Sequence, residues 1–403
     1  MRRDEARALT EVAAHGVTAL VDAVAGVQLA VTKRAYDAIG PVAVVPRVAQ
    51  HAVTSGVYAA VRGATTAAAR VAGLAAQAKC ADDDVARPLD ESRRARWLAA
   101  LSGAFGDALA EAHSPLAGQM SIRADWRAVP VTSAGLAAAF PSAHGRVVVF
   151  VHGLAGIETV WGAPSYGDRL EADVDDVTAV HLRYNTGRHI SDNGHDLDAL
   201  LDELVIHWPT TVTQLVLVGH SMGGLVIRSA CHYADQSDHT WPKLVTDAFS
   251  LGSPHRGAPL ERAVNVITAA LGRVPEVAPL AQLVDRRSAG VKDLRYGYLL
   301  DDDWGGYDAD EVRVDRGTDV ALLPNVRQHF IAATLTPTTD GRLGALVGDL
   351  LVLPASAHGQ AYGERRTRFP IERTAHVGGA HHLALLQHEQ VYALLRDALT
   401  DSA

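Results

Sequence analysis

The stretch that decides the fold is "QLVLVGHSMGGLVIRSA", which runs from Gln214 to Ala230. Its first half is a run of β-branched and leucyl residues, typical of a strand buried on both faces, and its second half is an apolar, helix-forming segment. Between them, glycines stand two positions before and two positions after Ser221. Glycine there removes Cβ atoms that would clash in a tight strand-to-helix turn. The stretch therefore predicts a serine held at a sharp bend, with the amides of a helix N-terminus beneath it.

Strands and helices alternate on both sides of this stretch. We predict strands over 146–153, 177–185, 214–220, 243–254, 326–335 and 368–377, and helices over 191–207, 222–233 and 382–399. Such alternation predicts an α/β fold with a mostly parallel sheet flanked by helices. A long segment over about 255–324 fits no strand, and we interpret it as a helical lid or cap insertion because long inserts in compact domains are usually functional.

The first 115 residues differ from the rest. Alanine and valine recur at helical spacing over 17–31 and 53–71, and a third predicted helix ends near His113. A stripe of such small side chains packs closely but buries little area, so these helices need a partner surface. We expect an N-terminal helical region over 1–115, serving packing, oligomerisation or surface docking, and a catalytic domain over 116–403.

Composition limits the class of protein. The chain has 403 residues, 48% of them apolar and 21% charged, and a formal net charge of −9, which argues against nucleic acid as the main partner. Two cysteines, Cys80 and Cys231, give no disulfide framework and fit a reducing compartment. The apolar run over 23–31 is too short to span a bilayer. We expect a cytoplasmic protein, and contact with a membrane or granule surface stays open.

The Gly-x-Ser-x-Gly pattern over 219–223 resembles the nucleophile elbow of the α/β-hydrolase superfamily. The resemblance covers roughly residues 146–398 and is closest to bacterial lipases and esterases; inositol-deacylase-like hydrolases are also similar. It implies the α/β-hydrolase fold and a serine nucleophile, Ser221, followed along the chain by an acid and then a histidine. The chain shows no metal-ligand cluster, phosphate loop or dinucleotide fingerprint, so we expect no cofactor and no metal.

A serine hydroxyl needs a base to take its proton, and the resemblance indicates which histidine that is. "GGAHHLALLQHEQ" follows the last predicted strand, and its match to the Gly-x-x-His-Leu setting of lipases and esterases selects His382. The neighbouring His381 is the alternative, one residue away. His376 and His388 are weaker candidates.

The acid comes from a later loop. "VGDLLV", residues 347–352, resembles the Gly-Asp segment of the family and selects Asp349 as the group that orients His382. Asp340, in "TTDGRLG", is the alternative, although an ordinary turn explains an aspartate before glycine equally well.

The resemblance also implies donors for the oxyanion and side chains near the pocket. One donor is the amide of Met222, after the nucleophile, and the other is that of Leu154 in "VFVHGLAG". Further residues expected near the substrate pocket are His152, Gly153, Tyr184 (with Asn185 or His189 beside it in "RYNTGRHISDNG") and His255 in "GSPHRGAPLERA".

The sequence thus predicts a serine carboxylester hydrolase that cleaves small-molecule or lipid acyl esters through an acyl-enzyme. A thioesterase, an acyltransferase or an intracellular polyester depolymerase would use the same fold and residues. A different alternative is a lipid-droplet or granule-associated protein, whose N-terminal helices bind the surface.

Overall fold

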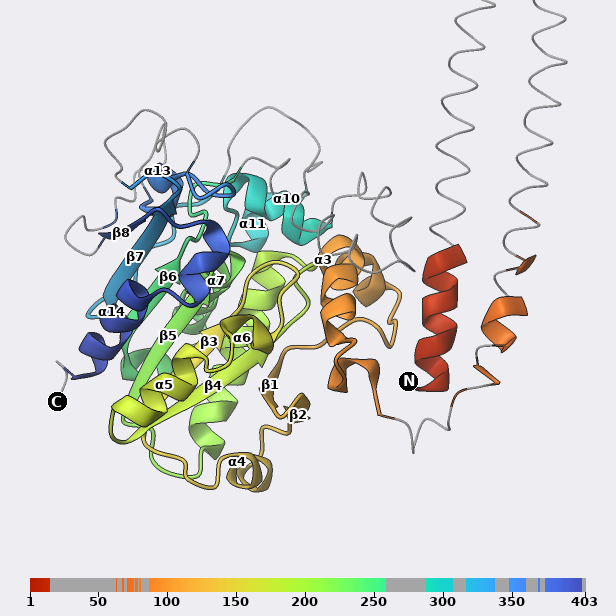
Figure 1. Ribbon diagram of the computed structural model, residues 1–403, viewed down its shortest axis with the longest axis horizontal. Helices are drawn as coiled ribbons and strands as arrows, with labels where there is room; N and C mark the ends of the chain where they lie inside the picture. Colours follow the sequence, from red (N-terminus) through yellow and green to blue (C-terminus); the bar gives the residue numbers. More distant parts are fainter. Residues whose placement is uncertain are drawn as a thin grey trace, which may run out of the picture.

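A computed structural model gives the architecture of the chain (Figure 1). It describes residues 1–14, 87–258, 288–306, 317–337, 348–359 and 374–400, together with 63, 67–68, 71–75, 77–78, 80 and 369. The predicted helix over 17–31, most of that over 53–71, the lid stretches 260–272 and 279–287, and Asp340 lie outside the described residues. No helix of the described part has both the length and the hydropathy needed to cross a bilayer.

Eight strands form one sheet in the described part of the chain, in the order β2-β1-β4-β3-β5-β6-β7-β8. They are β1 (Ser121–Ala124), β2 (Arg127–Val129), β3 (Arg146–Val151), β4 (Val177–Arg183), β5 (Gln214–His220), β6 (Val245–Leu251), β7 (Arg327–Thr334) and β8 (Thr374–Gly378). Neighbours from β4 to β8 run parallel, while β1 is antiparallel to both β2 and β4. The predicted mostly parallel sheet is confirmed.

Helices cover both faces of the sheet. They are α3 (Ala95–Glu111), α4 (Ser133–Ala139), α5 (Tyr166–Asp173), α6 (Ile190–His207), α7 (Met222–Gln236), α10 (Ala289–Tyr296), α11 (Asp301–Trp304), α13 (Pro354–Ala357) and α14 (Glu389–Thr400). Single 3-10 turns are η2 (Leu89–Glu91), η3 (Glu158–Trp161), η4 (Trp241–Leu244) and η6 (His382–Leu386). The single closing helix predicted over 382–399 is therefore wrong in detail: it divides into η6 and α14 because Gln387 leaves helical backbone angles, at φ −145 and ψ 27.

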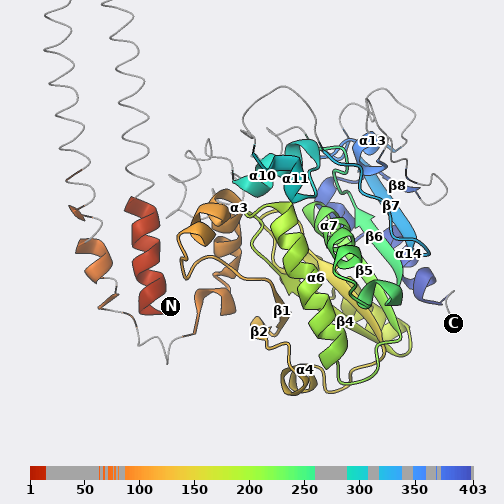
Figure 2. The same ribbon diagram turned by 180° about the vertical axis from the view of Figure 1, so that it is seen from behind.

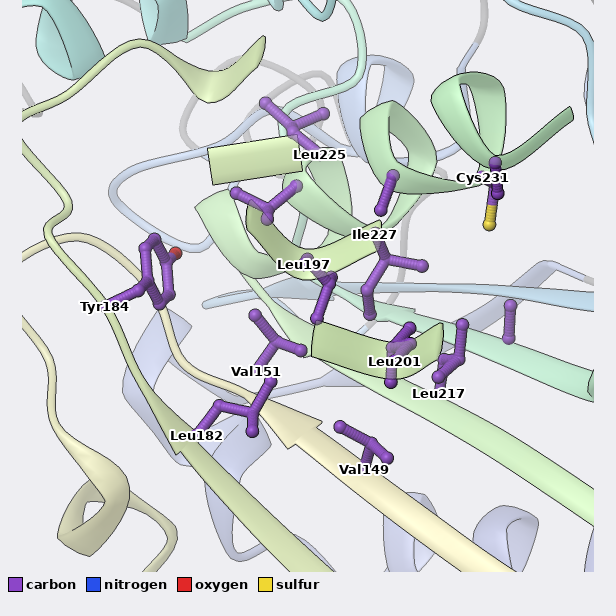
Figure 3. Close-up of a cluster of buried hydrophobic side chains, with 14 of the residues drawn as sticks. Val149, Val151, Leu182, Tyr184, Leu197, Leu201, Leu217, Leu225, Ile227 and Cys231 are labelled. Carbon is purple, nitrogen blue, oxygen red and sulfur yellow. The ribbon is translucent and has the colours of Figure 1, made fainter. Parts of the chain in front are cut away.

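Two apolar layers enclose the sheet. Val147, Val149 and Val151 of β3 join the buried cluster under α6 and α7, whereas Val148 and Phe150 join the cluster under α5 and α14. Figure 1 shows α5 and α14 on one face, and Figure 2 shows α6 and α7 on the other. Figure 3 shows the close packing of the layer under α6 and α7. Because successive strand residues point to opposite faces, this burial explains the continuous apolar runs 147–151 in β3 and 215–218 in β5.

Helix α3 packs against this domain although it lies within the predicted N-terminal region. Its residues Ala100 and Ala104 belong to the same buried cluster as β3 and α6. The division of the chain at residue 115 remains a prediction, but α3, before that point, is in contact with the sheet domain (Figure 2).

Candidate active site

Ser221 lies between β5 and α7 in a strained conformation, with φ 53 and ψ −120. A residue other than glycine seldom adopts positive φ, and strain of this kind gathers at functional sites. The flanking glycines are required by packing. A Cβ on Gly219 would lie 2.4 Å from the amide nitrogen of Gly224, and a Cβ on Gly223 would lie 2.2 Å from the carbonyl oxygen of Val151. The turn therefore accepts a side chain at its tip and none at positions 219 and 223.

His382 and Asp349 form a buried pair. The Nδ1 atom of His382, at the start of η6, lies 2.7 Å from Oδ2 of Asp349, and the His382 main-chain N–H donates to the Asp349 carbonyl oxygen at 3.1 Å. The other carboxylate oxygen of Asp349 accepts from the amides of Leu351 and Val352, at 2.9 and 2.7 Å. Since a carboxylate oxygen accepts, this bond assigns the ring proton of His382 to Nδ1 and leaves Nε2 as the basic nitrogen.

The surroundings of Asp349 keep it charged. Burial alone would raise the pKa of this carboxyl, but the nearby His382 ring and the hydrogen bonds from His382, Val352 and Leu351 together outweigh burial and lower the pKa below its ordinary value. Asp349 is therefore ionised at neutral pH and can orient the His382 ring and stabilise its protonated form.

One pocket brings His382 and Ser221 together. Both line it, and the Nε2 atom of His382 is buried without a hydrogen-bond partner among the described residues. Apart from His220, the rest of the lining is apolar or glycine: Gly153, Leu154, Gly156, Val160, Pro254, Ala258, Leu294, Leu351, Val352, Leu383 and Leu386. A hydroxyl and a basic ring nitrogen thus share an apolar pocket, which is the setting that nucleophilic catalysis by serine requires.

The alternative histidines lie elsewhere. His381 is exposed, as the residue that precedes η6. His376 is on β8, with its Nε2 atom 2.7 Å from the hydroxyl of Thr334, and the main chain of His388 is hydrogen-bonded to the Tyr166 hydroxyl. None of the three is among the described residues that line the pocket.

The loop after β3, residues 153–156, runs beside the serine. A Cβ on Gly153 would lie 2.9 Å from the Cβ of Ser221. Within the loop, the Gly156 amide donates to the Gly153 carbonyl at 3.0 Å and the Ala155 amide donates to the Thr186 hydroxyl at 3.1 Å. Leu154 lines the pocket, and its amide has no such partner among the described residues. The Met222 amide, at the first position of α7, has no acceptor within its own helix.

Three residues predicted to lie near the pocket, His152, Tyr184 and His255, are not part of its described lining and contact other groups. The His152 ring donates from Nδ1 to the Gly153 carbonyl at 2.9 Å, and Tyr184 stacks on that ring at 4.5 Å and donates its hydroxyl to the His152 carbonyl at 2.8 Å. His255 lies edge-on to Phe330 and Phe369. None of the three is among the described residues that line this pocket, so their place near the substrate stays a prediction; position at a strand end does not fix which way a side chain points.

His220 lines the pocket and was not predicted. Its Nε2 atom lies 3.3 Å from the His382 carbonyl oxygen, and the two rings are 4.7 Å apart. The only sequence signal was its place directly before Ser221. This contact joins the end of β5 to the main chain of His382.

Burial makes several histidines of the described part resist protonation, among them His255 and the three that follow. It lowers the pKa of His152 to about 4 and that of His181, stacked on Phe150, to about 4. The pKa of His220 falls to about 3 through burial and, secondarily, the nearby His382. Each group is neutral in the folded protein but protonates near pH 6.5 when unfolded. The stability that they contribute is therefore fully present above pH 6.5 and is lost as pH falls toward 4.

We therefore expect the free energy of unfolding to fall as pH decreases from 7 to 5, with each such histidine contributing up to about 1.3 kcal/mol per pH unit. Urea unfolding at pH 7, 6 and 5 measures it. Removing one group, as in His181→Gln, should make the fall shallower by about 1 kcal/mol per pH unit. A free energy of unfolding that stays constant from pH 7 to pH 5 would show that these rings are not neutral and buried.

Comparison with known proteins finds similarity to an α/β domain family and to lipases. Residues 142–309 match the family model of the PGAP1-like alpha/beta domain. Triacylglycerol lipases of Pseudarthrobacter phenanthrenivorans and Burkholderia plantarii are each 30% identical over 116 residues, which is 28% of this chain and 34% and 30% of those proteins. The chain thus spans about a third of the curated relatives it matches. The mature lipase BlEst2 of Bacillus licheniformis is 19% identical, with a TM-score of 0.41, over 64% of this chain and 93% of that one.

The family match and the observed sheet both indicate an α/β domain. The matched residues 142–309 include the loop after β3 and Ser221, and end before Asp349 and His382. Asp349 lies between β7 and β8 along the chain, and His382 follows β8; both strands belong to the same sheet. The chain has the α/β-hydrolase fold, and part of it is similar to lipases.

Proposed function

We propose that the chain is a serine carboxylester hydrolase, an esterase or lipase, that cleaves acyl esters through an acyl-enzyme. The observation that carries the proposal is the 2.7 Å contact between His382 Nδ1 and Asp349 Oδ2, in a pocket that Ser221 also lines. Ser221 is the nucleophile, His382 the base, and Asp349 the group that orients the base. The relatives that are triacylglycerol lipases support ester or lipid substrates.

The proposed reaction has two halves. The Oγ atom of Ser221 attacks the ester carbonyl carbon while Nε2 of His382 takes its proton, and the carbonyl electron pair moves onto the oxygen. The amides of Leu154 and Met222 stabilise this oxyanion. The intermediate collapses, and the bond to the alcohol breaks as His382 returns the proton to it. Water, deprotonated by the same ring, then attacks the acyl-enzyme and releases the acid.

The lining of the pocket supports an apolar acyl group. Val160 of η3 and Leu386 of η6 line it, as do Leu351 and Val352 beside Asp349. Exclusion of water by such side chains strengthens the interaction between the oxyanion and its donors. Burial of each methylene of the acyl chain contributes about 0.8 kcal/mol.

A fluorophosphonate probe and a series of p-nitrophenyl esters test the proposal. We expect the probe to add one phosphonyl group to Ser221, which peptide mass spectrometry would locate. The fraction of ester turnover that is lost should equal the fraction of protein that is labelled. Across acetate, butanoate and hexanoate, kcat/KM should rise about fourfold for each methylene that enters the pocket. Urea-unfolded protein is the control, because it keeps the hydroxyl but loses the base. Labelling at another residue, or no turnover of any ester, would overturn the proposal.

A further inference from the structure

We propose that Thr186 is a positioning residue for the oxyanion loop, residues 153–156, and that helix α3 holds Thr186 in place through Asn185. The inference rests on the proposed function, since it takes the Leu154 amide as an oxyanion donor. It gives α3, from the N-terminal part of the chain, a part in catalysis through the loops that it contacts.

The Thr186 hydroxyl fixes the residue next to Leu154. Ala155 has positive φ, 55, and its amide donates to Thr186 Oγ1 at 3.1 Å. The next amide, that of Gly156, is taken by the Gly153 carbonyl at 3.0 Å. Because Ala155 and Leu154 share a peptide unit, the bond from Ala155 to Thr186 also limits the orientation of Leu154. Loss of that bond would let a strained loop relax.

Asn185 joins the Thr186 segment to α3. Its side chain is buried, with Oδ1 accepting from the Ser102 hydroxyl at 2.7 Å and from the Gly187 amide at 3.1 Å. Its Nδ2 atom donates to the Gly106 carbonyl at 2.8 Å. A buried amide with donors and acceptors paired in this way is a rigid link, because every alternative position leaves a polar group unpaired.

The backbones of α3 and this loop are in direct contact. A Cβ on Gly106 would lie 1.9 Å from Asn185 Oδ1, and one on Gly187 would lie 2.1 Å from the Ser102 carbonyl oxygen. A Cβ on Gly103 would come within 3.2 Å of the Cβ of Ala155, so α3 also reaches the oxyanion loop itself. Only small residues permit such an approach.

Helix α10 encloses the same segment from another side. The Gly290 amide donates to the Gly187 carbonyl at 3.1 Å, and a Cβ on Gly290 would lie 2.2 Å from the Thr186 carbonyl oxygen. The Ser288 hydroxyl, just before α10, donates to the Gly103 carbonyl at 2.6 Å. The main chain at Thr186 is therefore held between two helices that are themselves joined.

The substitutions Thr186→Val and Thr186→Ser test the role of the hydroxyl. Valine keeps the shape of threonine and removes the acceptor for the Ala155 amide, so the Leu154 amide should no longer point at the oxyanion. On the best p-nitrophenyl ester, kcat should fall about 100-fold, and KM should stay within about twofold of the original value. Affinity for a trifluoromethyl ketone analogue, which forms a charged tetrahedral adduct, should fall in parallel with kcat/KM. Serine keeps the acceptor and should restore kcat to within about threefold of the original chain.

The control is Thr178→Val. Thr178 is also a buried threonine, at the start of β4, and its hydroxyl accepts the His144 amide at 2.9 Å, far from the carboxyl ends of the strands. This variant should leave kcat unchanged. A kcat of Thr186→Val within twofold of the original chain, or equal losses in the serine and valine variants, would overturn the inference. If Ser221→Ala also kept ester turnover, the proposed function itself would fail; if only the Thr186 variants were unaffected, the positioning role alone would fail.

Discussion

Replacement of Ser221 by alanine should lower kcat on p-nitrophenyl esters by about 10⁶-fold, because the hydroxyl that forms the acyl-enzyme is gone. The fold should remain, since alanine has the same Cβ and meets the same backbone restriction at φ 53. The circular dichroism spectrum and the urea midpoint should match those of the original chain. Residual turnover within tenfold of the original would place the nucleophile elsewhere.

Ser221→Gly separates the chemistry from the strain. This variant should be as inactive as Ser221→Ala but more stable by about 1 kcal/mol, because glycine adopts positive φ without steric cost. The two variants together make a matched pair, in which activity is lost in both and stability rises in one. Equal free energies of unfolding would show that the turn stores no strain at Ser221.

The adjacent histidines give the second large effect. His382→Ala should lower kcat by about 10⁵- to 10⁶-fold, whereas His381→Ala should change it by less than about twofold. The reason is the geometry: His382 is buried against Asp349 and lines the pocket, and His381 is exposed. Because the substitutions differ by one position in the same segment, each controls for the other.

His382→Gln guards against a loss of structure. Truncation of His382 removes a hydrogen bond to a buried carboxylate and should cost about 2 kcal/mol of stability. Glutamine can donate to Asp349 and keep that stability, but it cannot take a proton, so it should be as inactive as alanine. An active His382→Gln variant, or an inactive His381→Ala variant of normal stability, would show that the base is misassigned.

The architecture was largely readable from the chain, for a physical reason. Strands such as β3 and β5 are buried on both faces, which demands continuous apolar runs, and their predicted bounds agree closely with the structure. The choice of His382 and Asp349, in contrast, came from resemblance, because the contact between residues 33 positions apart depends on two loops. No periodicity in the sequence encodes that contact.

Other features left no usable signal. The contacts of α3 with the oxyanion loop and with the Asn185 segment depend on Gly103 and Gly106, and glycines inside a helical pattern look like weak points rather than a binding face. Likewise, Tyr184 was placed at the correct strand end, but its ring stacks on His152 instead of facing the pocket. Rotamers and main-chain turns decide such details after the strands have assembled.

The order of the strands has a consequence for the timing of activity. The four groups of the proposed machinery follow β3, β5, β7 and β8, so the first and last are separated by more than half of the chain. A growing polypeptide therefore contains the Ser221 hydroxyl long before the His382 ring that would deprotonate it has been synthesised. Parallel strands also pair only after distant segments meet, which is slow. Ester turnover therefore requires that synthesis has passed β8 and that the distant strands have paired.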